Sequence, residues 1–251
     1  DLHSFPTRRS SDLVLTLAPV IWTVLSSMRP PSESLSTDGS LIPSSLDFSS
    51  YPAVFEKVDM WLLILNSVLV TGIIAVGQML SSAMAGYVFA RFEFRSKNLL
   101  FALILATMMV PMQVTIVPVF MLIRGMNLAD TLLALILPAI PTAFGTFLMR
   151  QYFMGLPAEL GEASEIDGAT PWRTFASIYA PLATPGMAIV GILAFNFHWN
   201  EFFRPLILTI SEQNFTLPLG LVSLQGNMGT GSVATVLARS EEHTSELQSQ
   251  Y

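Results

Sequence analysis

The chain has 251 residues, of which 52% are hydrophobic and only 12% are charged, whereas ordinary soluble domains carry roughly a quarter charged residues. This composition excludes an ordinary soluble globular protein. The formal net charge of −6 leaves no basic surface for a phosphate backbone, so no nucleic acid partner is expected. The absence of cysteine excludes disulfides, thiolate catalysis and cysteine-ligated metals.

The two ends of the chain break the apolar pattern. Residues 3–13 read as a translation of a short-read sequencing adapter, and residues 239–249 resemble the partner adapter. We therefore expect residues 1–13 and 239–251 to be artefacts, and residues 14–238 to be the native part, cut at both ends. The alternative is a polar, signal-like head and a solvated acidic tail.

Charged residues are absent from five long runs, which predict membrane spans. The runs are Val14–Met28, Met60–Ala90, Asn98–Ile123, Thr131–Met149 and Thr174–Asn200. A helix needs about 20 apolar residues to cross a hydrocarbon core of about 30 Å, so the last four are long enough to span. The first run is too short, as expected of a first span that lost its beginning. The predicted fold is an all-α, polytopic transmembrane helix bundle with about five spans.

Basic residues orient these spans. Arg91, Arg95 and Lys97 lie together in one short loop, which the positive-inside rule places in the cytoplasm. Alternation then places Arg150–Pro181 inside as well. The loops expected outside are Arg29–Asp59, Arg124–Asp130 and Ser211–Gly231. These loops are too short to hold a soluble catalytic domain.

Prolines and small residues inside the spans indicate helix breaks and close helix contacts. The prolines are Pro111, Pro118, Pro138 and Pro141. Each frees backbone groups that neighbouring helices, side chains or water must satisfy. Ser82 and Gly86 form a small-xxx-small pair, which lets two helices approach closely. Ordinary bundle packing with tolerated kinks is the alternative explanation for each feature taken alone.

The cytoplasmic loop after Arg150 predicts two short helices. Pro157 suits the first helical position and Gly168 a left-handed C-terminal cap, which predicts a helix of about 11 residues. A second helix is expected to begin with Thr170 as N-cap and Pro171 at its first position, and to run into Pro181. Two such helices would form a rigid knob facing the cytoplasm, with a solvated loop helix as the alternative.

The first of these helices is predicted to have two different faces. The acidic face carries Glu159, Glu162 and Glu165, and the small, apolar face carries Leu156, Leu160 and Ala163.

The knob carries a pattern that resembles a known family. Glu162, Ala163 and Ser164, then Gly168, then Ile178 to Pro181 resemble the Glu-Ala-Ala, Gly and Ile-x-Leu-Pro signature of binding-protein-dependent ABC transporter permeases. The sequence departs from that signature at Ser164, where the family has a second Ala, and at Ala180, where it has Leu. The spacing is intact.

A second resemblance narrows the subfamily. Trp199–Leu206 and Phe215–Leu221 resemble the fifth-helix segment and the following loop of sugar-transporting permeases of the maltose-permease type. Arg91–Arg95 and Pro111–Gln113 match that subfamily too. The similarity covers nearly all of residues 14–238. Family members continue with a sixth transmembrane helix, which we therefore expect to be missing.

The resemblance implies a multi-pass permease subunit of an ABC importer in the inner membrane of a prokaryote. It would form the pathway for a solute, by its subfamily a carbohydrate. Its implied partners are ABC ATPase subunits, a second permease subunit in a heterodimer, an extracytoplasmic solute-binding protein and the lipid bilayer. The sequence has no phosphate-binding loop of the G-x-x-x-x-G-K-[ST] type, so ATP is expected on the separate ATPase. We expect no enzyme activity, cofactor or metal in this chain.

In this family the knob docks in a cleft of the ATPase, and its closure moves the membrane helices. By motif position, Glu162 would be a charged contact, Ala163 a small residue at a close approach, and Gly168 the turn that aims the second helix. The candidate coupling loop comprises Glu162, Ala163, Ser164, Asp167, Gly168 and Pro181.

Polar residues in the spans are candidates for the translocation pathway. They are Gln113, Asn196, Trp199, Asn200 and Glu201. Glu201 can pair with Arg204 three residues later, which favours a clamp between helices. Asn200 has no obvious local partner, which favours the pathway. His198 is read as a packed residue at the interface, because residues 14–238 contain no second histidine to partner it.

Two rival functions remain open. A polytopic membrane enzyme acting on lipid-like substrates would need clustered acid, His or Ser groups near an interface, and only the Asn196–Glu201 patch comes close. A purely structural subunit would leave the predicted knob without a use.

Overall fold

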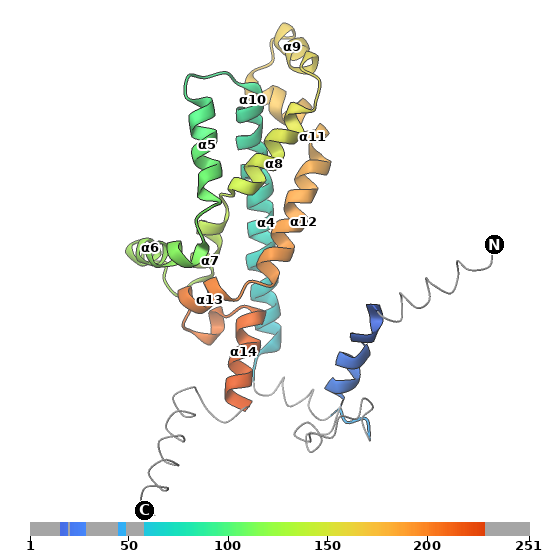
Figure 1. The fold of residues 1–251 in the computed structure, drawn as a ribbon, viewed down its shortest axis with the longest axis vertical. Helices are drawn as coiled ribbons and strands as arrows, with labels where there is room; N and C mark the ends of the chain where they lie inside the picture. The colour runs from blue at the N-terminus through green and yellow to red at the C-terminus, as the bar shows by residue number, and fades with distance from the viewer. Residues whose placement is uncertain (1–15, 20, 29–44, 49–57, 229–251) are drawn as a thin grey trace, which may run out of the picture. The chain divides into compact units, whose positions relative to one another are not determined.

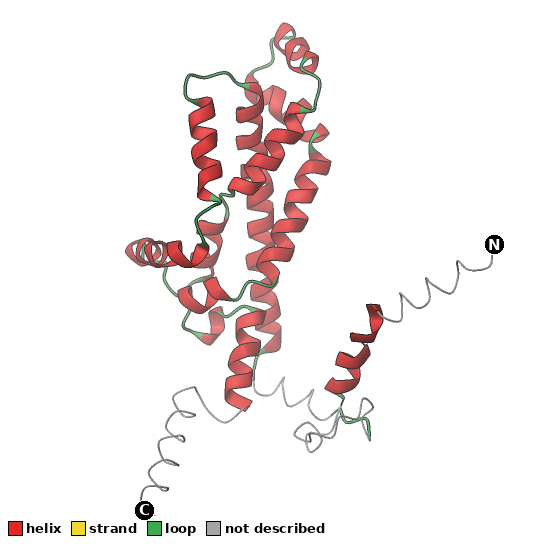
Figure 2. Cartoon of the chain, viewed as in Figure 1, coloured by secondary structure: helices red, strands yellow, loops and turns green. Residues whose placement is uncertain are grey.

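The computed structural model describes residues 16–19, 21–28, 45–48 and 58–228. Those residues form helices and loops without a strand (Figure 2), which confirms the all-α prediction. The chain divides into two units, Asp1–Met60 and Trp61–Tyr251. In the first unit, residues 16–19 and 21–27 are helical, within the run predicted as a truncated span. Both predicted adapter segments lie outside the described residues.

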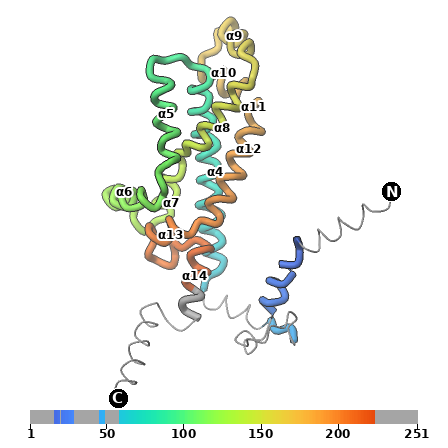
Figure 3. The backbone as a smooth tube through the Cα atoms, in the orientation of Figure 1, coloured from blue at the N-terminus to red at the C-terminus, as the bar shows by residue number. Residues whose placement is uncertain are grey.

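Helix α4, Met60–Arg91, is the long axis of the second unit. Within the described part of the chain it is the single unbroken helix that is long and apolar enough to cross a membrane. It coincides with a predicted charge-free run and ends at the first arginine after that run. In Figures 1 and 3, α5, α8 and α12 run beside α4, α9 lies at one end, and α13 and α14 lie at the other.

The run Asn98–Ile123 does not form the single span that its length predicts. It divides into α5, Lys97–Thr107, and α6, Met112–Gly125, which meet at an angle of 101°. The break falls before Pro111, whose ring disfavours a helical conformation in the preceding residue. Pro118 lies inside α6 without ending it, so one of the two proline breaks predicted in this run is absent.

The run Thr131–Met149 is also broken, as its prolines predict. It contains α7, Leu132–Ile136, the 3₁₀ turn η1, Leu137–Ala139, and α8, Ala143–Met154, with a bend of 41°. Pro138 lies in η1, and Pro141 lies in the gap before α8. The hydroxyl of Thr142 caps α8 by accepting a hydrogen bond from the Gly145 amide at 3.3 Å.

The last predicted span contains parts of two different structures. Its first residues belong to a helix in the cytoplasmic loop, composed of α10, Pro171–Thr174, the π-helical turn η2, Phe175–Tyr179, and α11, Ala180–Leu182. The membrane helix itself is α12, Thr184–Trp199, which is bent by 73° from that loop helix. At 1.5 Å per residue, its 16 residues extend about 24 Å.

The predicted outer loop Ser211–Gly231 is partly helical. After α13, Phe203–Leu208, come the 3₁₀ turn η3, Glu212–Asn214, and α14, Leu217–Met228. The expectation of a plain loop was wrong because this segment is apolar and packs on α4. The Leu217 amide donates to Ser67 Oγ at 2.7 Å, and the Asn66 side chain donates to two carbonyl groups just before α14.

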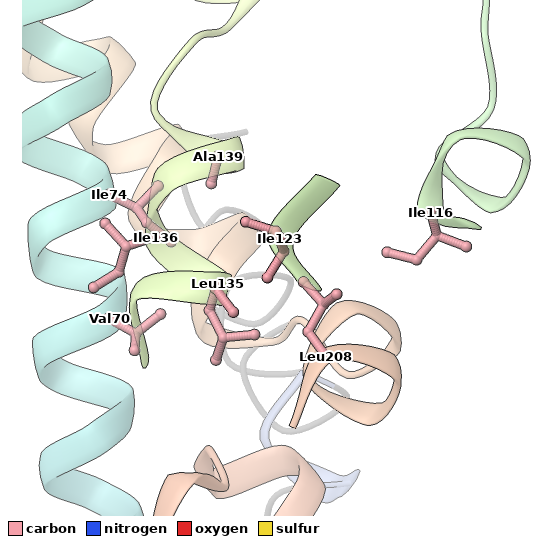
Figure 4. Packing of buried hydrophobic residues seen from close by; sticks show 9 residues of the cluster. Val70, Ile74, Ile116, Ile123, Leu135, Ile136, Ala139 and Leu208 are labelled. Carbon is pink, nitrogen blue, oxygen red and sulfur yellow. The ribbon is translucent and has the colours of Figure 1, made fainter. Parts of the chain in front are cut away.

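Helix α4 contributes to two hydrophobic cores. The first is aliphatic and joins α4 to α6, α7 and α13 through residues such as Val70, Ile123 and Leu208 (Figure 4). The second contains aromatic side chains that join α4 to α8 and the loop helices. Its buried members are Ala83, Tyr87, Met149, Phe153, Phe175, Tyr179, Ala183 and Val190.

The predicted close helix contact at Ser82 and Gly86 is confirmed. A Cβ atom on Gly86 would lie 2.6 Å from Cβ of Met149 in α8, and a Cβ atom on Gly145 would collide with the Ser82 side chain. Small residues at these positions therefore allow α4 and α8 to pack directly against each other.

Candidate functional site

The predicted knob is present at one end of the bundle (Figure 1). Its first helix, α9, spans Glu159–Ile166 and is shorter than the predicted 11 residues, because Ala158 is its N-cap and Pro157 lies before it. Gly168 has a φ angle of +73°, which confirms the left-handed cap. The Ala169 amide closes that cap by donating to the Ser164 carbonyl at 2.9 Å.

The second helix of the knob begins as the sequence predicts. Pro171 is at its first position, and the Thr170 hydroxyl accepts a hydrogen bond from the Arg173 amide at 3.4 Å. The helix continues through Pro181, which is exposed, to Leu182, one residue further than predicted.

The small, apolar face of α9 is only partly buried. Leu156 and Leu160 are half-buried and Ala163 is exposed, whereas Ser164 is buried with 4% of its surface exposed. The Ser164 hydroxyl donates to the Gly161 carbonyl at 2.7 Å and lies 2.8 Å from Thr174 Oγ1 in α10. Ser164, which stands where the family signature has Ala, therefore forms a hydrogen bond that joins the two helices of the knob.

Close packing explains why this inner face is made of small residues. A Cβ atom on Gly161 would lie 2.9 Å from the Tyr179 hydroxyl. The predicted acidic residues Glu159, Glu162 and Glu165 are all exposed, and Glu162 and Glu165 also line a cavity of about 520 Å³ beside Arg91. Ile166 is 87% exposed beside them, a large apolar residue that the sequence analysis did not single out. Asp167 and Gly168 are exposed as well.

Arg91 anchors the knob to the end of α4. Its guanidinium donates to the carbonyl groups of Phe153 and Leu156, both at 2.6 Å, and lies 4.8 Å from the ring centroid of Tyr179. The sequence analysis used Arg91 only to orient the spans. The sequence did contain a signal for this role, because Arg91 is the first charged residue after a long apolar run and lies at the start of the loop.

A second candidate site lies at the other end of α12, where four polar side chains from three segments meet. The Glu201 carboxylate forms an ion pair with Arg204 Nη2 at 2.8 Å, which confirms the predicted pairing. Its other oxygen lies 2.7 Å from His198 Nδ1. His198 Nε2 in turn lies 3.1 Å from Nε2 of Gln78 in α4. We call these four residues the Gln78–Arg204 network.

Backbone carbonyl groups of the broken α7–η1 segment complete this network. Gln78 Nε2 donates to the Ala139 carbonyl at 2.8 Å, and Arg204 Nη1 donates to the Leu135 carbonyl at 3.1 Å. His198 and Arg204 are each 8% exposed, and the Glu201 side chain is equally buried. The network therefore joins α4, α7–η1 and the junction between α12 and α13 in a buried setting.

The hydrogen bonds assign the tautomer of His198. An amide nitrogen can only donate, so His198 Nε2 must accept from Gln78 and cannot carry a proton. The proton is then on Nδ1 and is donated to Glu201. The expectation that His198 is a packed residue is confirmed, but its partner is the amide of Gln78, which the sequence analysis did not identify.

The five pathway candidates do not form one site. Asn196, Trp199 and Asn200 line a depression of about 250 Å³ on one side of α12. Glu201 belongs to the buried network instead. Gln113 is exposed on α6 and lines neither this depression nor the larger cavity beside the network. Asn200 does have a local partner, contrary to expectation, because its side chain donates to the Asn196 carbonyl at 2.8 Å.

Asp130 forms a further polar cluster that the sequence analysis missed. Its carboxylate accepts hydrogen bonds from the Ser211 hydroxyl at 2.5 Å and from the amides of Ile210 and Ser211 at 2.9 Å. These hydrogen bonds lower the pKa of the Asp130 carboxyl well below its ordinary value. The bond from the Ser211 hydroxyl has the largest effect, and the two backbone amide bonds come next. Asp130 thereby fastens the loop before α7 to the loop after α13.

Comparison with known proteins identifies the family. A family model described as "binding-protein-dependent transport system inner membrane component" matches residues 77–238. The chain belongs to this family. Among its relatives, an arabinooligosaccharides transport system permease protein of Halalkalibacterium halodurans is 35% identical over 233 residues, covering 89% of this chain and 84% of the relative. A trehalose transport system permease protein of Mycobacterium tuberculosis is 35% identical over 227 residues, covering 87% and 81%.

A solved structure shares the fold of this binding-protein-dependent permease. It is a bacterial ABC transporter involved in the import of the acidic polysaccharide alginate. The two chains superpose with a TM-score of 0.76 at 24% identity, covering 93% of this chain and 82% of the other. The family resemblance and the helical fold expected from the sequence are thus confirmed. The chain is a permease subunit of an ABC importer.

Proposed function

We propose that this permease carries a carbohydrate across the inner membrane of a prokaryote and couples its passage to ATP hydrolysis by a separate ATPase subunit. Relatives named for arabinooligosaccharides and trehalose support the substrate class. The observation that carries the coupling is the knob itself. It presents an exposed acidic face and a fixed turn at Gly168 while Arg91 holds it to α4.

The proposed coupling follows from how the knob is connected. Helix α11 leads into α12 through the bend at Ala183, so a displacement of the knob acts directly on a membrane helix. The far end of α12 is tied to α4 and α7 by the Gln78–Arg204 network. Glu162 and Asp167 supply exposed charge for docking, Gly168 sets the turn, and Ser164 stiffens the pair of helices. Ala163 and Pro181 remain exposed for contact.

The proposed assembly contains two ATPases, a second and different permease subunit, and an extracytoplasmic solute-binding protein. The family description supports dependence on a binding protein. In this assembly ATP binds to the ATPases, and this chain binds no cofactor and catalyses no reaction. The lipid-modifying enzyme is not favoured, because both ring nitrogens of His198 are already engaged by Gln78 and Glu201.

The polar residues near the end of α12 have two proposed roles. Glu201 clamps helices together, because its charge is matched by Arg204 within the buried network. Asn196, Trp199 and Asn200 face an open depression and contribute to the pathway. Gln113, on the separate helix α6, would contribute at a different point.

Reconstitution of the complete transporter tests the proposed function. The gene would be expressed together with its neighbours, and the complex purified and placed in liposomes with its binding protein. We expect an ATPase subunit to co-purify, and ATP-dependent uptake of at least one of labelled arabinotriose, diacetylchitobiose and trehalose. A complex without an ATPase, or without uptake of any of these sugars, would contradict the proposal.

A further inference from the structure

A cavity of about 590 Å³ lies beside the Gln78–Arg204 network. It is bordered by α4, by the broken segment between η1 and α8, and by the outer half of α12. Its volume falls within the roughly 300–1,000 Å³ typical of small-molecule sites. The side chains of Gln78, Phe144, Leu193, Asn196 and Phe197 are among those that line it.

Irregular backbone forms one wall of this cavity. Pro138, Ala139, Pro141 and Thr142 line it, where the helix is interrupted. Non-helical backbone at membrane depth is tolerated where it is buried in protein or lines a water-filled cavity. Two carbonyl groups of this segment are satisfied from α4, at Ala139 by Gln78 and at Ile140 by Ser81. Side chains of α4 therefore satisfy backbone carbonyl groups at the helix break.

Gln78 leaves one hydrogen-bonding group unused at this wall. Its residue surface is 9% exposed, and its amide nitrogen is occupied by Ala139 and His198. Among the described residues, no donor lies on Gln78 Oε1. The side-chain amide of Asn196, also on the cavity wall, likewise has no partner within the described part of the chain. An unused acceptor on Gln78 and an amide of Asn196 with both donor and acceptor groups thus border the same space.

We propose that this cavity is a transit subsite for a neutral, hydroxylated solute such as one unit of an oligosaccharide. Hydroxyl groups would donate to Gln78 Oε1 and exchange hydrogen bonds with the Asn196 amide. The rings of Phe144 and Phe197 offer apolar surface to the C–H groups of a sugar ring. The inference rests on the proposed function and adds the site and its selectivity to it.

The electrostatics of the wall favour a neutral solute over an anion. Arg204 borders the cavity, but its charge is matched by Glu201 at 2.8 Å and one of its nitrogens is bonded to the Leu135 carbonyl. His198 is neutral in the tautomer assigned above. No uncompensated cation therefore faces the cavity from the described residues, so a phosphorylated solute gains no ion pair there.

Single cysteine variants test the site directly, because the chain has no cysteine of its own. In the reconstituted complex with cysteine-free partners, Phe144→Cys and Leu193→Cys would be placed in the cavity, and Thr107→Cys on α5 would serve as the control outside it. We expect a water-soluble methanethiosulfonate reagent to label both cavity positions. Whichever of arabinotriose, diacetylchitobiose or trehalose is carried should slow that labelling at least fivefold, and sn-glycerol-3-phosphate should not.

The outcomes separate the two proposals. Failure of all three sugars to be carried would remove both the proposed function and this site. A carried sugar that leaves labelling of the cavity positions unchanged, or cavity positions that the reagent never labels, would overturn the site alone. Equal slowing at Thr107→Cys would also overturn it, because protection would then not be local. Protection by sn-glycerol-3-phosphate would overturn the selectivity for neutral solutes.

A kinetic experiment provides a second readout. Asn196→Leu should raise the sugar concentration at half-maximal uptake by about fivefold to tenfold, the effect of roughly one lost hydrogen bond. The yield of assembled complex should stay at the wild-type level, as in the control Thr107→Val. A fall in assembly with an unchanged half-maximal concentration would assign Asn196 a structural role and overturn its place in the site.

Discussion

The two ends of α12 hold their charged groups in opposite ways. At the knob, the acidic side chains of α9 are exposed, and the helices are held together by backbone caps, small residues and the Ser164 hydroxyl. At the Gln78–Arg204 network, both charges are buried, and each contacts an oppositely charged or polar partner. A surface for docking can therefore change charge without unfolding, whereas the network cannot.

The largest loss of stability is expected from a substitution in the buried Gln78–Arg204 network. Glu201→Ala would leave the guanidinium of Arg204 buried without its partner and remove the acceptor of His198. Loss of one partner of a buried pair costs about 3–5 kcal/mol. Thermal unfolding of the detergent-solubilised complex measures this loss of stability, with Glu165→Ala on the exposed face of α9 as the control. Equal stability of the two variants would show that the network is not buried as described.

A smaller effect on stability, with a large effect on transport, is expected at the turn of the knob. Gly168→Asp forces a residue with a Cβ into a left-handed conformation, which costs about 1–2 kcal/mol. Among the described residues, no atom other than those of Gly168 and its chain neighbours lies within 4 Å of that Cβ, so the strain is in the backbone.

We expect the Gly168→Asp variant to insert and assemble but to lose transport coupled to ATP. Gly72→Ala on α4, where the added Cβ also meets open space, is the matched control and should transport normally. Glu162→Lys, which reverses charge on the exposed face, should lose coupling without loss of stability. Wild-type uptake in either knob variant would contradict the coupling role.

The hydrogen bond inside the knob allows a finer test. Ser164→Ala restores the residue of the family signature but leaves Thr174 Oγ1 without its partner. We expect a loss of about 1 kcal/mol in stability, typical of one hydrogen bond. Ser164→Ala combined with Thr174→Val should recover part of it, because both polar groups are then gone. A double variant less stable than the sum of the single variants would refute this account of the contact.

A substitution of Asn200, at the end of α12 away from the knob, tests whether this residue contributes to the pathway or only to packing. Its hydrogen bond to the Asn196 carbonyl is local and exposed, so Asn200→Ala should cost at most about 0.6 kcal/mol. Uptake per assembled complex should fall if the residue contributes to the pathway. Uptake and stability measured on the same preparation decide it, and unchanged uptake with reduced stability would make Asn200 a packing residue.

The smallest effect concerns the loop fastened by Asp130. Because the folded-state pKa of this carboxyl is lowered, its contribution to stability is present above the ordinary value of 3.8 and is lost as the pH falls below that value. Asp130→Asn should therefore be less stable than wild type at pH 7, and the difference should shrink below about pH 4. A difference that grows as the pH falls would contradict the assigned direction.

The sequence predicted features governed by local chemistry better than those that depend on distant partners. Thr170, Pro171 and Gly168 act on their immediate neighbours, so the caps of the knob could be read directly. Pro111 marked a helix break, but a proline does not determine the 101° angle, which depends on packing of α6 against α7 and α13.

Partners far apart in the sequence explain most of what was missed. Gln78 and His198 are 120 residues apart, and the amide of Gln78 gave no sign of which residue it would meet. The burial of Ser164 depended on the position of Thr174 and Tyr179, which a three-residue motif does not specify. The outward charges of α9 were predictable, since helical spacing alone places them together.

The length of α4 has a consequence for where ATP-driven force enters the protein. Its 32 residues extend about 48 Å, against a hydrocarbon thickness of about 30 Å. Even a tilt of about 40°, the upper end of the usual range, leaves about 37 Å along the membrane normal. The helix is therefore longer than the acyl-chain layer is thick at any usual tilt, so its two ends cannot both lie among the acyl chains. We expect the end that carries Arg91 and the knob to project, which would let the proposed ATPase reach the knob without entering the hydrocarbon layer.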